Sequence, residues 1–72
     1  MNRDILLFAV TCIEGIAENL GISGTSAYEL LTAKSDLLDS YIVAFYDTLH
    51  TQSKEYVVDE LVNLIRHEGL LG

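Results

Sequence analysis

The sequence has no proline and only one cysteine, Cys12, among its 72 residues. A single cysteine excludes an internal disulfide bond, and its position in an apolar run predicts a buried thiol. Without proline, no helix of the chain has to kink or stop at a missing amide hydrogen. No apolar run approaches the roughly 20 residues of a membrane span. With no sign of an oxidising compartment, these absences lead us to expect a cytoplasmic protein.

Basic residues are also scarce, with four Lys and Arg against eleven Asp and Glu, and a formal charge of −7. Nucleic-acid binding depends on cations that neutralise phosphates, so we expect no nucleic-acid partner. An acidic domain is better suited to a basic protein, because opposite potentials steer their encounter. The simpler interpretation is that the acidity only keeps a small protein soluble.

A chain of this length forms one domain, residues 1–72, near the lower limit for an independent hydrophobic core. Such a domain buries only about 60% of the surface that its unfolded chain exposes. Small domains therefore often gain stability from a partner or a second copy.

Apolar residues recur at helical spacing, and no alternating strand pattern or repeat is present. The spacing predicts helices over Asn2–Leu20, Gly24–Ala33, Asp36–His50 and Ser53–Glu68. Asn2 and Ser23 are expected caps, while Gly21 and Gly69 are expected stop positions. The predicted buried face of the third helix consists of Leu37, Leu38, Tyr41, Ile42, Phe45, Tyr46 and Leu49. The sequence therefore predicts an all-α, compact four-helix domain with short connections.

The segment Ile16–Leu31 has the layout of a helix-turn-helix, with Gly21 at the turn. The side chains that would face a DNA groove belong to Ser23, Gly24, Thr25, Tyr28 and Glu29. None is basic, whereas base reading favours Arg, Lys, Asn or Gln with phosphate contacts beside them. The segment is therefore either a turn at which two helices pack together or a DNA-binding motif with few residues suited to base contacts.

The region around His50 has polar side chains but lacks the pattern of a catalytic or metal site. A zinc-binding helix would carry paired ligands four residues apart, and neither His50 nor His67 has such a partner. We therefore expect no catalytic residue, no cofactor and no metal. The corner motif His50, Thr51 and Gln52 is instead predicted to cap the third helix.

The candidate partner-binding residues lie mainly on the polar side of the fourth predicted helix. Helical spacing places Tyr56, Glu60, Asn63 and His67 together, opposite the apolar stripe. Tyrosine is enriched at interfaces because its ring offers a large contact area at low entropic cost. The alternative is that Tyr56 packs within its own domain. Leu7 and Val43 are further candidates, as apolar residues on otherwise polar helix sides.

Five short motifs are shared with a known family. They are C-I-E at 12–14, I-S-G at 22–24, Y-E-L-L at 28–31, L-H-T-Q at 49–52 and K-E-Y at 54–56. Through them nearly the whole chain resembles a small uncharacterised bacterial family of domains of unknown function. Such families often have glycine after the corner, where this chain has Ser53.

The resemblance implies no established activity. Members of the family are often encoded beside a protein that resembles an ADP-ribosyltransferase. This neighbourhood implies an antitoxin-like or chaperone-like pair in which the small acidic chain is the non-catalytic member. Together with the residues, it favours a non-enzymatic protein–protein interaction module that binds a protein partner. The alternatives are a helix-turn-helix-like transcriptional regulator and a structural homodimer.

Overall fold

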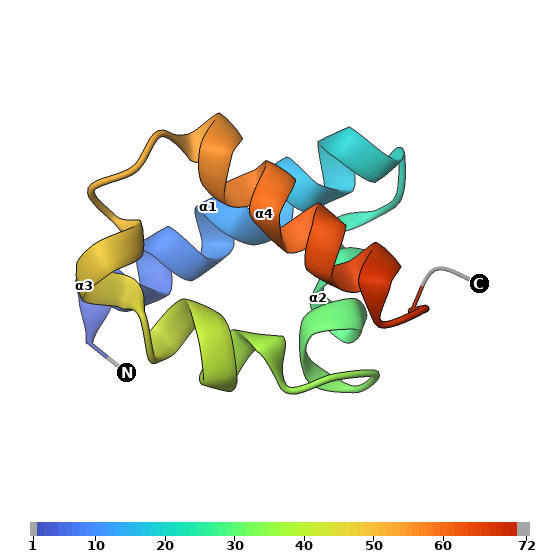
Figure 1. Ribbon diagram of the computed structural model, residues 1–72, viewed down its shortest axis with the longest axis horizontal. Coiled ribbons are helices and arrows are strands. Elements are labelled where there is room, and N and C mark those ends of the chain that lie inside the picture. The colour runs from blue at the N-terminus through green and yellow to red at the C-terminus, as the bar shows by residue number, and fades with distance from the viewer. Residues whose placement is uncertain (1, 71–72) are drawn as a thin grey trace.

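In residues 2–70, which the computed structural model describes, the chain forms five helical segments and no strand. The segments are α1 (Arg3–Leu20), α2 (Gly24–Thr32), the π-helix η1 (Leu38–Val43), α3 (Tyr46–Leu49) and α4 (Lys54–His67). Figure 1 shows α4 crossing in front of α1, and η1, drawn in yellow-green, running along the lower edge of the molecule. The predicted all-α class is therefore confirmed.

Side-chain caps and glycine fix the ends of α1 and the start of α2. The Asn2 side chain accepts a hydrogen bond from the Ile5 backbone N–H at 2.9 Å, which satisfies one unpaired donor of the first turn. Gly21 ends α1 in the left-handed conformation, with φ of 66°. Ser23 then caps α2 by accepting from the backbone N–H of Ser26. These ends are the ones that the sequence predicts.

The last helix, α4, is closed in the same way at both ends. The Ser53 hydroxyl accepts from the Tyr56 backbone N–H at 3.2 Å. Gly69 has φ of 71°, and the N–H of Leu70 donates to the carbonyl of Ile65. This hydrogen bond folds Leu70 back against the core, where it is half-buried.

The predicted third helix, Asp36–His50, is wrong as a single α-helix, and the four-helix count is wrong with it. The structure has the π-helix η1 followed by the one-turn α3. The N–H of Ala44 donates to the carbonyl of Asp39, five residues earlier, and Phe45 leaves helical geometry with φ of −109° and ψ of 19°. The wider π turn rotates the following residues relative to an α-helix. Phe45, predicted to be buried, is consequently 52% exposed.

The core lies between α1 and the other helices, which pack around it. Its largest fully buried side chains come from four of the five segments and are Ile16, Leu31, Ile42, Val57, Leu61 and Ile65. Cys12 also lies in the core, as predicted, with only 2% of its surface exposed.

The crossing of α1 and α4 is a close approach at Gly15. A Cβ atom built on this glycine would lie 2.5 Å from Cγ2 of Val58, well inside the contact distance of two carbon atoms. Glycine at position 15 therefore sets how closely the two longest helices can pack.

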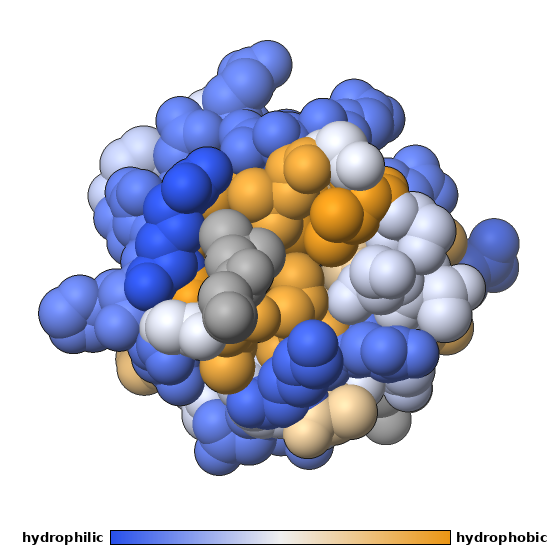
Figure 2. All heavy atoms as spheres, turned by 90° about the vertical axis from the view of Figure 1, so that its right-hand side faces the viewer, coloured by the Kyte–Doolittle hydropathy of each residue, from blue (hydrophilic) through white to orange (hydrophobic). Residues whose placement is uncertain are grey.

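Figure 2 shows one end of the molecule, where apolar residues reach the surface in the middle of a rim of hydrophilic ones. Such exposure is expected of a chain too short to enclose all of its apolar residues.

Candidate partner-binding surface

The outer side of α4 carries the four residues predicted from helical spacing to share one face. Tyr56, Asn63 and His67 are exposed, and Glu60 is half-buried. Half of the Tyr56 surface is open to solvent, so its ring is not enclosed by a neighbouring helix. The structure thus presents an aromatic ring with polar side chains around it on a rigid helix.

Glu60 links Tyr56 to the neighbouring η1 segment. A hydrogen bond with Glu60, together with its negative charge, raises the pKa of the Tyr56 hydroxyl. Burial raises the pKa of Tyr41, and the charge of Glu60 and the nearby Tyr56 raise it further. Tyr41 of η1 and Tyr56 of α4 therefore lie near the same carboxylate.

Phe45 extends this group of side chains. Its ring centroid lies 5.8 Å from that of Tyr41. We call Tyr41, Phe45, Tyr56 and Glu60 the aromatic surface. Sequence reasoning missed its Tyr41–Phe45 part, because a continuous α-helix would have turned both rings inward.

The other two candidates lie on different elements. Val43 is half-buried at the end of η1, and Leu7 is 54% exposed on α1. Val43 therefore offers less free surface than predicted, while Leu7 offers as much as its position on the polar side implied.

The corner motif closes the end of α3. The Thr51 hydroxyl donates to the carbonyl of Thr48 at 2.7 Å, and the Gln52 backbone N–H donates to Leu49. The His50 ring stacks on Tyr46 with centroids 4.8 Å apart, and Tyr46 makes an edge-to-face contact with Phe8. These contacts join α3 to α1.

The helix-turn-helix segment has an angle typical of that motif. The axes of α1 and α2 turn through 113° at the three-residue connection. The residues from Ser23 to Ser26 are exposed, as are Tyr28 and Glu29, and none of them is basic.

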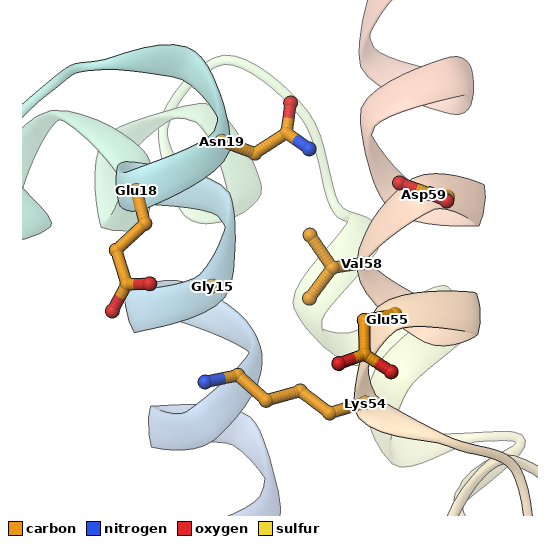
Figure 3. Close-up of a pocket in the computed structure, with 7 residues that line it drawn as sticks. All are labelled: Gly15, Glu18, Asn19, Lys54, Glu55, Val58 and Asp59. Atoms are coloured by element: carbon orange, nitrogen blue, oxygen red, sulfur yellow. The ribbon is translucent and has the colours of Figure 1, made fainter.

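A groove of about 370 Å³ lies between α1 and α4, and Gly15 is part of its lining. Figure 3 shows Glu18 and Asn19 on α1, and Lys54, Glu55, Val58 and Asp59 on α4, with the Val58 side chain pointing towards α1. Sequence reasoning missed this groove, and a glycine within an otherwise regular helix was its only signal. Among residues 2–70, no group of His, Cys, Asp or Glu side chains is arranged to hold a metal ion.

Within the same residues, no single helix has the length and apolar character needed to cross a membrane. Only α1 and α2 counted together have that length and apolar character, and the chain bends by 113° between the two helices.

A family model described as "Protein of unknown function (DUF3791)" matches residues 7–68. The match covers all five helical segments apart from the first turn of α1. No curated protein matches the chain significantly, and neither does any solved structure.

Proposed function

Because the chain belongs to the DUF3791 family, whose description names no activity, we propose from its surface that it is a protein-docking module. It binds a protein partner through the aromatic surface, in the cytoplasm, and performs no chemistry of its own. The match to residues 7–68 confirms the predicted family of unknown function. The docking role is our proposal.

The observation that carries the proposal is the half exposure of two aromatic rings on a small acidic domain. Phe45 is 52% exposed and Tyr56 is 50% exposed, and Tyr41 lies near both. Aromatic rings that exclude water while their polar tips stay hydrogen-bonded are typical anchors of interfaces. The Tyr56 hydroxyl lies near the Glu60 carboxylate, which raises its pKa.

The charge of the chain indicates the chemistry of the partner. At −7, the domain attracts a protein with a basic surface. The resemblance noted above suggests that this partner is a protein encoded beside the gene and similar to an ADP-ribosyltransferase. This chain would mask or chaperone that protein.

The non-enzymatic part of the proposal is supported by the side chains available. The groove between α1 and α4 combines Lys54 with Glu18, Glu55 and Asp59, and its lining has no hydroxyl, thiol or imidazole. Such a set of exposed charges is a solvated surface more often than a site for bond making.

The test is to purify the chain with the protein encoded beside its gene and to measure their binding kinetics. We expect Tyr56→Ala to speed dissociation about tenfold or more, as for a buried anchor. Tyr28→Ala is the matched control, because Tyr28 is equally exposed at 50% but lies on α2. Glu60→Lys should slow association, with an effect that fades as salt is added.

The proposal fails if Tyr56→Ala unfolds the chain and leaves binding per folded molecule unchanged. It also fails if the Tyr28 and Tyr56 variants weaken binding equally. Circular dichroism of each variant separates loss of fold from loss of contact.

A transcriptional regulator is the second candidate, favoured by the 113° angle between α1 and α2. We place it second because the exposed residues of α2 carry no cation.

A further inference from the structure

One side of α1 carries an apolar stripe that no other segment of residues 2–70 covers. Leu7 and Val10 are 54% and 41% exposed, and they lie between exposed Arg3 and Glu14. Leu6 is exposed beside them. Apolar side chains grouped on one helix side are a surface on which another chain can pack.

We call Arg3, Leu7, Val10 and Glu14 the α1 stripe. These four residues share one face of the helix because of their spacing. Arg3, Leu7, Val10 and Glu14 follow each other at intervals of four, three and four residues. This is the spacing of the a and d positions of a coiled coil, at which side chains meet a facing helix. The hydroxyl of the neighbouring Thr11 donates to the carbonyl of Leu7 at 2.9 Å, so it can be covered without losing a partner.

The order of the residues makes the α1 stripe complementary to itself. Arg3 and Glu14 are equally distant from a point between residues 8 and 9, and so are Leu7 and Val10. With a rise of about 1.5 Å per residue, the charged pair lies about 8 Å from that point and the apolar pair about 2 Å. A second α1 rotated by half a turn about this point therefore presents Glu14 to Arg3 and Val10 to Leu7.

We propose that the α1 stripe binds a second copy of this chain, with the two α1 helices antiparallel. Leu7 of each copy packs on Val10 of the other, and the four side chains form one apolar cluster. Arg3 of each copy pairs with Glu14 of the other at both ends of the cluster. The contact uses the same residues on both copies, as a two-fold interface requires.

Charge complementarity selects this occupant and this direction. The antiparallel arrangement brings opposite charges together twice, whereas a parallel one would oppose Arg3 to Arg3 and Glu14 to Glu14. With only four Lys and Arg in the chain, the placement of one at the end of an apolar stripe is informative. The two apolar layers are few, so the dimer forms and dissociates with protein concentration.

The dimer is independent of the proposed docking function, because the aromatic surface lies on η1, on Phe45 before α3 and on α4. Tyr56→Ala is therefore the control that leaves dimerisation unchanged.

The experiment is sedimentation velocity of the chain over a range of concentrations. We expect the average mass to rise from monomer towards dimer. Leu7→Glu should weaken dimerisation at least about tenfold, because it puts two carboxylates into the apolar cluster. Since Leu7 is exposed in the monomer, the Leu7→Glu variant should have the circular dichroism of the original chain.

The charge swap tests the direction of the helices. Arg3→Glu and Glu14→Arg should each weaken dimerisation about fivefold, because each replaces two attractive pairs with repulsive ones. The double variant should recover most of the original affinity, since each pair is then present in reverse.

A chain that stays monomeric at every concentration overturns the proposal. So does a dimer that Leu7→Glu leaves intact, or a double variant that dimerises no better than the single ones.

Discussion

Gly15 is the residue on which the packing of α1 against α4 depends most directly. Its missing side chain lets Val58 approach the α1 backbone, and Cε of Lys54 lies 3.3 Å from the position of the absent Cβ. A β-branched side chain such as Val58 has little freedom to turn away within a helix.

We predict that Gly15→Ala lowers the free energy of unfolding by about 1 kcal/mol. Alanine favours the helix by up to ~1 kcal/mol, but overpacking against Val58 costs about 1–3 kcal/mol. Urea unfolding of the two proteins measures the difference.

Gly24→Ala is the matched control, because a Cβ atom there meets nothing within 4 Å. The control should be neutral or slightly stabilising. Equal stability of the Gly15 and Gly24 variants would mean that the helices separate at no cost.

Cys12 gives a second prediction at the scale of a residue, this time about pH. Burial raises the pKa of its thiol to about 11, although Lys54 acts in the opposite direction. The unfolded chain loses the thiol proton at its ordinary pKa of 9.0, before the folded chain does. Stability is therefore fully present below about pH 9 and falls as the pH rises towards about 11, by up to about 2 kcal/mol.

Unfolding by urea at a series of alkaline pH values measures this loss. The pKa values of Tyr41 and Tyr56 are also raised and act in the same direction. Comparison with Cys12→Ala isolates the thiol, since that variant should lose less stability over the same range. Parallel curves for the two proteins would contradict the prediction.

Among the helical elements, the η1–α3 segment differs from the others because its hydrogen bonds are irregular. It combines a π-helix of six residues with an α-helix of four, separated by the non-helical geometry of Phe45. By contrast, α1 and α4 are regular and capped by side chains.

We predict that the amides of Ile42 and Leu49 exchange with solvent at least about tenfold faster than those of Val58 and Leu61. All four side chains are buried, so the comparison reports the backbone and not exposure. Hydrogen exchange followed by NMR measures each amide. Equal protection would show that the segment opens only when the whole chain unfolds.

The same contrast separates what the sequence predicts from what it does not. Caps and apolar spacing predict α1, α2 and α4 to within one residue at each end. The π turn could not be predicted, because Leu37, Ile42 and Leu49 have the spacing of an ordinary helix face. The polar side of α4 was predictable by the same spacing, whereas the contact of Tyr41 with Phe45 depends on the π turn.

For the whole molecule, the main property is its net charge of −7, carried by a small single domain. Repulsion from phosphates opposes nucleic-acid binding, whatever the angle between α1 and α2.

We therefore predict that the isolated chain does not retard duplex DNA at physiological salt in an electrophoretic assay. Retardation that weakens with added salt, and with Thr25→Ala or Tyr28→Ala, would contradict this and favour the regulator. The matched control is Asp59→Ala, which changes the acidic side of α4 and should have no effect in either case.

The crossing of α1 and α4 also has a consequence for synthesis on the ribosome. The buried stripe of α1 is made before α2, η1, α3 and α4, and α4 covers much of it. Chains grow at about 5–20 residues per second, so the buried Ile16 and Cys12 of α1 are made seconds before α4. Folding therefore completes only after residues 54–67 have been made and can pack on α1.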